Sequence, residues 1–235
     1  IAICGGIGCL GGRDDLIHAF DKEIKKLKLE GKVDVRVTGC HGFCAQGPNI
    51  VIYPEEICYV KVKPKDATEI ISETIVGKKV VDRLVYTDPN TGEKAVYQSE
   101  IPYYKKQMRN LLGTNPKIDP RSIDDYLAIG GYSSLAKALS KMTPEQVLEE
   151  VKRANLRGRG GGGFPAGLKW ETARNAPAEL KYVICNGHEG EPGAYMDRAI
   201  FQGNPHLIIE GLIIGGYAVG AQQGFIYTRH DMPRL

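Results

Sequence analysis

The chain has 235 residues, of which 42% are hydrophobic and 25% are charged, a composition that is ordinary for a soluble globular protein. This length accommodates one large domain or two small ones. The formal net charge of +3 is too small to indicate a nucleic-acid partner or an anionic membrane as partner.

The longest apolar stretch runs from Leu207 to Ala221, and Glu210 interrupts it. A membrane-spanning helix needs about 20 apolar residues, so we expect no membrane span. No signal peptide is visible, and the first residue is Ile1 rather than Met, which suggests that the true N-terminus lies upstream. We expect a cytoplasmic protein.

Residues 1–77 are predicted to form a small α/β domain. Apolar residues recur at helical spacing over 14–29 and alternate with polar residues over 33–38. Pro54 to Glu56 separate two apolar runs that are expected to form a hairpin. The order strand–helix–strand–hairpin–helix is a thioredoxin-like arrangement. The expected strands are 1–4, 33–38, 49–53 and 57–62, and the expected helices are 14–29 and 66–76.

Residues 78–125 are predicted to be a linker or wrapping segment, with a turn at Pro89–Gly92 between two short strands and a weak helix over 101–112. Residues 126–235 are predicted to be a second α/β domain. Its first clear helix begins at Thr143, where Thr-Pro-Glu-Gln provides an N-cap and a capping box. A strand at 182–185, a helix from 204 to about 219 and a strand at 225–228 would form a parallel crossover.

The six cysteines include two close pairs, Cys4-x4-Cys9 and Cys40-x3-Cys44, each surrounded by glycines. A 2Fe–2S cluster needs four thiolates on loops that wrap its sulfides, and glycine lets backbone amides approach the sulfur atoms. Structural zinc and a dithiol redox site are the alternatives, but both typically use Cys-x2-Cys spacing, which neither pair has. Cys58 and Cys185 are interpreted as small buried hydrophobic residues.

Cys-x4-Cys followed about 30 residues later by Cys-x3-Cys-x2-Gly-Pro resembles the thioredoxin-like 2Fe–2S ferredoxins, which include the 24-kDa-type subunit of respiratory complex I. This resemblance covers about residues 1–77. It implies that Cys4, Cys9, Cys40 and Cys44 hold a 2Fe–2S cluster.

A glycine-rich run from Arg157 to Pro165 exposes many backbone amides that can hold a phosphate. Its G-x-G-x-x-G match is weak as a dinucleotide fingerprint because a helix precedes it, and no P-loop Lys-Ser or Lys-Thr pair follows. The alternative is a flexible hinge. A second loop, Asn186 to Gly193, follows a strand, where ligands of open α/β sheets bind. Its alternative is a solvated, charged turn.

Together the two loops resemble the flavin- and NADH-binding subunit of complex I and its relatives. The matching motifs are Gly163-Phe164-Pro165, Gly167-Leu168-Lys169-Trp170 and Glu189-Gly190-Glu191-Pro192-Gly193, within a resemblance that runs from about Ile101 to Thr228. The fold class expected for the chain is therefore α/β, with an N-terminal thioredoxin-like 2Fe–2S domain followed by part of an α/β domain that binds flavin mononucleotide (FMN) and NAD(H).

This resemblance implies roles for ten residues and no catalytic side-chain acid or base. FMN would be contacted by the glycines, by the cations Arg159 and Lys169, and by Asn186 and Glu189 after the strand. Phe164 would stack on the nucleotide, and Glu191 would hydrogen-bond the nicotinamide. His188 stands where the family usually has Asp, so its role is open. The implied cofactor-binding residues are Gly158, Arg159, Gly160, Gly161, Phe164, Lys169, Asn186, His188, Glu189 and Glu191.

A second departure from the family follows the last strand, where the family usually has Arg-x-Glu-Tyr-Pro. Here the chain reads Arg229-His230-Asp231-Met232-Pro233, and Asp231 is the candidate substitute for the glutamate.

A ferredoxin domain fused to a flavin domain resembles the beta subunits of electron-bifurcating FeFe hydrogenases, NADP-reducing hydrogenases and NAD-dependent formate dehydrogenases. The implied function is that of an NAD(P)H:acceptor oxidoreductase that moves electrons between NAD(P)(H), FMN and iron–sulfur clusters, as the diaphorase subunit of an electron-bifurcating hydrogenase complex. The implied partners are other iron–sulfur subunits, with ferredoxin as a further candidate. The alternatives are a formate dehydrogenase beta subunit, a complex I flavin subunit, or a non-catalytic electron-transfer module. The chain is expected to be truncated, with a 4Fe–4S cluster in the missing C-terminal part.

Overall fold

The computed structural model describes residues 1–6 and 10–230. The chain divides into two compact units. The first unit comprises Ile1–Ser122 and Gln202–Asn204, and the second comprises Ile123–Phe201 and Pro205–Leu235.

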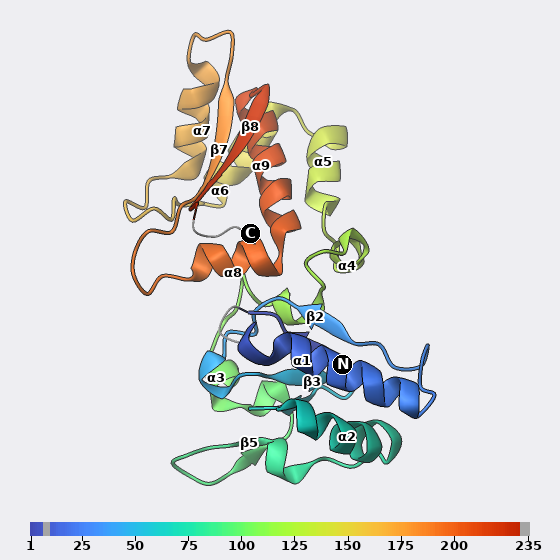
Figure 1. The fold of residues 1–235 in the computed structure, drawn as a ribbon. Helices are drawn as coiled ribbons and strands as arrows, with labels where there is room; N and C mark the ends of the chain where they lie inside the picture. The colour runs from blue at the N-terminus through green and yellow to red at the C-terminus, as the bar shows by residue number, and fades with distance from the viewer. Residues whose placement is uncertain (7–9, 231–235) are drawn as a thin grey trace. The chain divides into compact units, whose positions relative to one another are not determined.

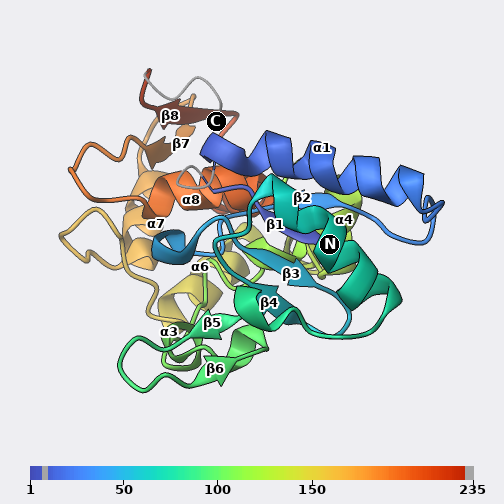
Figure 2. The same cartoon turned by 60° about the horizontal axis from the view of Figure 1, so that its bottom comes forward.

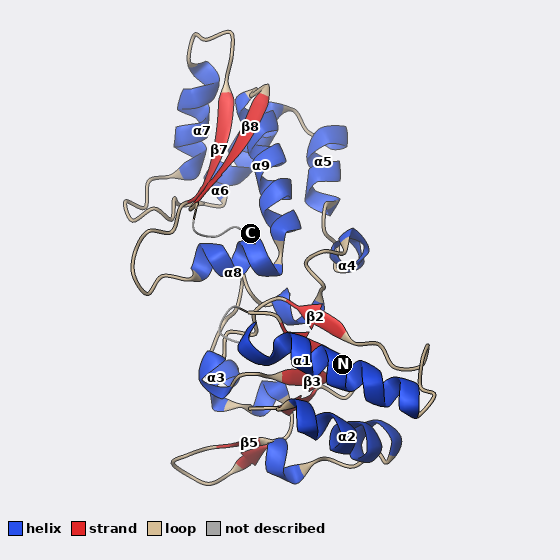
Figure 3. Ribbon diagram, in the orientation of Figure 1, coloured by secondary structure: helices blue, strands red, loops and turns tan. Residues whose placement is uncertain are grey.

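The first unit is built on a four-stranded sheet of order β2-β1-β3-β4 (Figures 1 and 3). β1 and β2 are parallel, whereas β3 is antiparallel to both β1 and β4. All four predicted strands and the hairpin are confirmed, although each strand is shorter than predicted. The strands are β1 (Ala2–Cys4), β2 (Arg36–Thr38), β3 (Ile50–Ile52) and β4 (Ile57–Tyr59).

The helix α1 (Leu10–Lys26) is confirmed but displaced, because it begins four residues before the predicted start and ends three before the predicted end. It ends where Lys28 adopts a left-handed backbone with φ of 53°. The second predicted helix is also confirmed. It begins as α2 (Ala67–Glu69) and continues as a π-helix over Ile70–Val76.

Both faces of this sheet are covered. One face packs on the two helices through a core that includes Ile3, Phe20 and Ile70. The opposite face packs Val51 and Cys58 against side chains from residues 86–104, among them the fully buried Ile101. The segment after the second helix therefore completes the core of the first unit.

That segment contains the antiparallel strands β5 (Tyr86–Thr87) and β6 (Lys94–Ala95), as predicted around the turn (Figure 2). The predicted helix over 101–112 is wrong in extent, since α3 spans only Pro102–Lys105. Beyond it Met108 is 87% exposed and Leu111 is 44% exposed, so no packed apolar face supports further helical turns.

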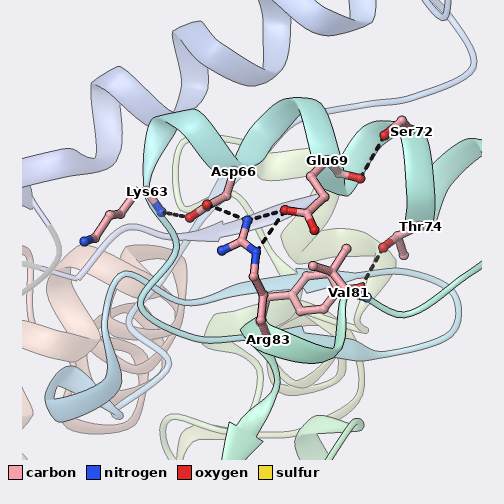
Figure 4. A network of polar contacts seen from close by, with 8 residues as sticks. Lys63, Asp66, Glu69, Ser72, Thr74, Val81 and Arg83 are labelled. Atoms are coloured by element: carbon pink, nitrogen blue, oxygen red, sulfur yellow. Dashed lines mark hydrogen bonds and ion pairs between the residues drawn. The ribbon is translucent and has the colours of Figure 1, made fainter.

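A polar network ties the π-helix region to the following loop (Figure 4). The buried Asp66 carboxylate accepts hydrogen bonds from the Lys63 amide and from the Arg83 guanidinium, both at 2.8 Å. Arg83 also pairs with Glu69. Nearby, the Tyr59 hydroxyl lies 2.6 Å from the Thr74 hydroxyl and accepts from the Val81 amide at 2.9 Å. Each buried polar group of this network therefore has a partner.

The second unit contains a two-stranded parallel sheet joined by a long helix, which confirms the predicted crossover (Figure 1). The capping box of α6 is also confirmed, with the Gln146 amide donating to Thr143 Oγ1 at 3.3 Å and the Thr143 amide to Gln146 Oε1 at 2.8 Å. The elements are α4 (Ile123–Ala128), α5 (Ser133–Lys141), α6 (Pro144–Arg153), α7 (Ala166–Asn175), β7 (Tyr182–Gly187), α8 (Met196–Gly203), α9 (Pro205–Val219) and β8 (Gln223–Thr228).

The sheet of the second unit is covered on one face only. Val183 and Gly224 lie towards α9, together with Leu212. On the other face Ile184 and Phe225 are paired in register and are 63% and 50% exposed. A parallel sheet normally has both faces buried, so this one presents an open apolar surface.

Within the described residues, no helix combines the length and the apolar character that crossing a bilayer requires.

Candidate cofactor sites

Three of the four predicted cluster ligands meet at one end of the first unit's sheet. Cys4 ends β1, Cys40 follows β2, and Cys44 opens a short 3-10 turn over Cys44–Gln46. The Cys40 thiol is close enough to the thiols of both Cys4 and Cys44 for each of them to shift its pKa. The fourth predicted ligand, Cys9, lies outside the described residues. The fold thus brings Cys4 to the pair Cys40 and Cys44, which follow it by 36 and 40 positions in the sequence.

Backbone amides point at these sulfur atoms. The His41 amide donates to Cys4 Sγ at 3.4 Å, and the Gly42 amide donates to Cys40 Sγ at 3.3 Å. Gly42 has a φ of +84°, which favours glycine. A Cβ atom on Gly6 would lie 2.8 Å from Cys40 Sγ, so glycine is required for the close approach. Amide donors to sulfur are what tunes an iron–sulfur cluster in a protein.

Burial and the neighbouring cysteines make the thiols of Cys40 and Cys44 harder to deprotonate. The hydrogen bond with Cys4, followed by burial, raises the pKa of the Cys40 thiol, and burial followed by the Cys40 charge raises the pKa of Cys44. Metal cations bound between these sulfur atoms would instead lower the pKa of the thiols, because a cysteine that ligates a metal is deprotonated. The donor set therefore fits a thiolate-bound cluster. Among the residues described, no group of three or more His, Cys, Asp or Glu side chains is arranged to hold a single metal ion.

His41 lies between the two downstream cysteines and was not predicted as functional. It is fully buried, and its Nε2 lies 2.9 Å from Thr38 Oγ1. Burial, with a smaller contribution from the positive charge of Arg109, lowers the pKa of His41 to about 3. The imidazole is thus neutral. Its position inside the Cys40–Cys44 spacing was the only sequence signal that could have identified it.

The remaining cysteines behave differently. Cys58 on β4 is 1% exposed, and burial raises the pKa of its thiol to about 12. Its predicted role as a small buried hydrophobic residue is confirmed. Cys185 on β7 is only half-buried, so the same prediction is wrong for Cys185, which lies on the sheet that is covered on one face only.

The glycine-rich run forms a loop between α6 and α7 that is closed at its base. The Gly158 amide donates to the Phe164 carbonyl at 2.9 Å, and Arg157 Nη1 donates to the Gly163 carbonyl at 3.0 Å. At the tip, no described heavy atom lies within 4 Å of the Cβ positions of Gly160, Gly161 or Gly162.

This geometry leaves the backbone at the tip open, as close contact with a phosphate or a flat ring requires. Phe164 at the end of the loop is 58% exposed, and Arg159 and Lys169 are also exposed. The loop therefore fits the predicted flavin contacts.

The acidic loop begins at the end of β7. Asn186 Oδ1 accepts from the His188 amide at 3.0 Å, and the His188 ring meets the Tyr227 ring edge-on at 5.4 Å. The Glu189 carboxylate accepts from the Asp197 amide at 3.0 Å and from the Arg198 amide at 3.1 Å, at the start of α8. This carboxylate thus caps a helix N-terminus, a structural role that the sequence did not reveal.

Glu191 is exposed in the same loop. In Figures 1 and 2 the acidic loop and the glycine loop project from the same side of the second unit. The roles predicted for the residues of both loops stay predictions. Arg229 Nη1 donates to the Glu189 carbonyl at 3.2 Å, whereas the predicted substitute Asp231 lies outside the described residues.

Known proteins resemble both parts of the chain. Residues 151–235 match the Nuo51 FMN-binding domain family. A wild-type thioredoxin-like 2Fe–2S ferredoxin from Aquifex aeolicus is 30% identical in a match that covers 37% of this chain and 94% of that protein, with a TM-score of 0.34.

Two curated relatives are subunits of hydrogenases. The NADP-reducing hydrogenase subunit HndC of Solidesulfovibrio fructosivorans is 51% identical over 55% of this chain and 26% of the relative. The NAD-reducing hydrogenase HoxS subunit alpha of Cupriavidus necator is 32% identical over 83% of this chain and 30% of the relative. The chain thus spans less than a third of the length of these relatives. The predicted resemblance is confirmed: residues 151–235 match the FMN-binding domain family of the complex I flavin subunit, in a chain similar to hydrogenase subunits.

Proposed function

We propose that this chain is part of an NAD(P)H:acceptor oxidoreductase subunit that moves electrons between NAD(P)(H), FMN and a 2Fe–2S cluster. The observation that carries the proposal is the convergence of Cys4, Cys40 and Cys44 in a chain whose residues 151–235 match an FMN-binding domain family. Cys9 would be the fourth ligand.

The chain's own residues supply binding and electrostatics rather than acid–base chemistry. The open backbone at Gly160 and Gly161 would hold FMN, with Gly158 at the base of the loop and with Arg159 and Lys169 providing positive charge beside it. When bound, FMN accepts a hydride from the nicotinamide and passes electrons singly to iron–sulfur clusters. A cation near a flavin favours its anionic reduced form, which is the role proposed for Lys169.

The acidic loop would complete the nucleotide side of this site. Asn186 and Glu189 would contact the flavin, Phe164 would stack on the nucleotide, and Glu191 would bind its nicotinamide end. Because the Glu189 carboxylate already caps α8, its proposed contact with the flavin uses the remaining acceptor capacity of its oxygens. His188 would add a hydrogen-bond donor in the same loop.

The hydrogenase relatives support a finer assignment. We propose that the subunit acts as the diaphorase of a cytoplasmic, electron-bifurcating hydrogenase complex, with other iron–sulfur subunits and ferredoxin as partners. We also propose a 4Fe–4S cluster outside these 235 residues, as the family resemblance implies. Co-purification with a hydrogenase catalytic subunit would support this assignment, and co-purification with a formate dehydrogenase or with a membrane arm would contradict it.

A visible spectrum of anaerobically purified protein tests the general function. We expect cluster absorption together with flavin bands near about 450 nm that bleach on addition of NADH or NADPH. Cluster absorption without flavin bands would support a non-catalytic electron-transfer module instead. Absence of both would contradict the proposal.

A further inference from the structure

The loop that carries Cys40 and Cys44 is covered by a segment outside the predicted ferredoxin domain. We call Ile101–Arg109 the cap segment. The Tyr103 ring stacks on the Phe43 ring with centroids 4.5 Å apart, and the Tyr103 hydroxyl donates to the Gly42 carbonyl at 2.5 Å. Ile101 is fully buried and anchors the segment. The cap segment is therefore fixed on the loop by an aromatic stack, a hydrogen bond and a buried apolar anchor.

The cap segment ends in a cation that is directed at this loop. The Arg109 guanidinium lies 5.4 Å from the centroid of the Tyr104 ring, a cation–π distance. Its Nη2 atom lies 3.6 Å from the place that a Cβ on Gly42 would take, between the two cysteines. This nitrogen is buried and, in the part of the chain that the structure describes, donates to no acceptor.

The surroundings of Arg109 do not neutralise it. No carboxylate forms an ion pair with Arg109 among the residues that the structure describes. His41 is fully buried in the same loop, and its backbone amide donates to Cys4 Sγ. Arg109 therefore places a positive charge without an ion-pair partner, among the described residues, beside the cysteine loop. The dielectric constant of the partly buried surroundings is lower than that of water, which strengthens the field of this charge.

We propose that the fixed positive charge of Arg109 raises the reduction potential of the 2Fe–2S cluster. This inference rests on the proposed function, since it requires the cluster. Reduction adds one electron to the cluster and breaks no bond, so the reduced form carries one more negative charge than the oxidised form. A nearby cation stabilises the form with more negative charge, and net charge is one of the factors that set cluster potentials.

The proposal is tested by redox titration of the cluster in the whole chain, followed by electron paramagnetic resonance. The variants are Arg109→Gln, which removes the charge, and Arg109→Lys, which keeps it. Lys105→Gln is the matched control, because it removes an exposed positive charge from the same segment. Iron content and thermal unfolding of every variant show whether the cluster and the fold are retained.

We expect the midpoint potential of Arg109→Gln to move to more negative values, and the potentials of Arg109→Lys and Lys105→Gln to stay close to that of the unmodified protein. Equal potentials in Arg109→Gln and the unmodified protein would overturn the proposal. If Arg109→Gln loses its iron, Arg109→Lys decides: a retained cluster of unchanged potential supports the role of the charge, and loss of the cluster from both variants overturns it. An unmodified protein without a 2Fe–2S signal would instead contradict the proposed function itself.

Discussion

The two units of this chain differ in how many faces of their sheets are covered by other elements. In the first unit, helices cover one face and residues 86–104 cover the other, so that Ile3 and Val51 on opposite faces are both fully buried. In the second unit, α9 covers one face, and Ile184 and Phe225 remain exposed on the other. The predicted cluster site thus lies on a closed framework, whereas the predicted flavin site lies beside an open one. The same kind of substitution should therefore have different consequences in the two units.

The largest expected effect is loss of the cluster. Cys40→Ala removes a thiol that contacts both Cys4 and Cys44, so we expect loss of iron and of cluster absorption. Cys58→Ala is the matched control in the same sheet, since Cys58 is a buried residue outside the ligand set. Iron analysis and visible absorption after anaerobic purification check this expectation. A full cluster content in Cys40→Ala, or loss of iron from Cys58→Ala, would contradict the ligand assignment.

The next largest effect is a loss of stability, which should be large at a buried position of the first unit and small on the exposed face of the second unit's sheet. Ile101→Ala should destabilise the first unit by about 2–5 kcal/mol, because it opens a cavity beneath the cap segment. Ile184→Ala on the open face should change stability by less than about 1 kcal/mol. Chemical denaturation of both variants measures the difference. Similar losses for the two substitutions would show that the open face is covered in solution.

A polar contact inside the second unit gives a smaller effect. The buried Glu210 carboxylate accepts from the amides of Tyr132 and Leu135 at 2.9 and 3.1 Å and from the Tyr126 hydroxyl at 2.5 Å. Glu210→Gln replaces one acceptor oxygen by a donor, so we expect a loss of about 1–3 kcal/mol.

The control for Glu210→Gln is Glu149→Gln on the exposed side of α6, which should be nearly neutral. Thermal unfolding of the two variants separates the outcomes. Equal melting temperatures would mean that Glu210 does not organise the start of α5.

The smallest effect is a pH dependence in the first turn of α8, next to the acidic loop. Burial, followed by the negative charge of Glu189, raises the pKa of Asp197 above its ordinary value. A raised carboxyl pKa in the folded state means that its contribution to stability is present at acidic pH and is lost as pH rises through the folded pKa. Asp197→Asn should therefore slightly stabilise the second unit at neutral pH. Melting curves recorded from about pH 3 to about pH 7 should converge at the acidic end, and divergence there would contradict this explanation.

Local signals in the sequence predicted much of the fold. The capping box at Thr143 and the hairpin around Pro54 depend on residues within a few positions of each other, and both are confirmed. The capping box and the hairpin could be predicted because each is specified by a short stretch of chain. The convergence of Cys4 with Cys40 and Cys44 is long-range, and it was predicted from the type of site that the spacing and the glycines indicate.

Long-range contacts could not be predicted in the same way. The hydrogen bond from Tyr103 to the Gly42 carbonyl joins residues 61 positions apart, and Glu210 meets Tyr126 across 84 positions. The helix predicted over 101–112 was too long because the apolar residues Met108 and Leu111 in its second half are exposed rather than packed. The Glu189 carboxylate was identified as a cofactor ligand from its motif, although its present partners are amides of α8.

The anchoring of Ile101 has a practical consequence for protein production. A fragment cut at residue 77, where the ferredoxin resemblance ends, would lack the side chains that cover Val51 and Cys58 and the ring that stacks on Phe43. Such a fragment would expose apolar surface beside its cysteines and would tend to aggregate or to lose iron to oxidants. An expression unit that keeps this cover on the cysteine site therefore extends at least through Ser122, and it would still lack Gln202–Asn204, which belong to the same unit.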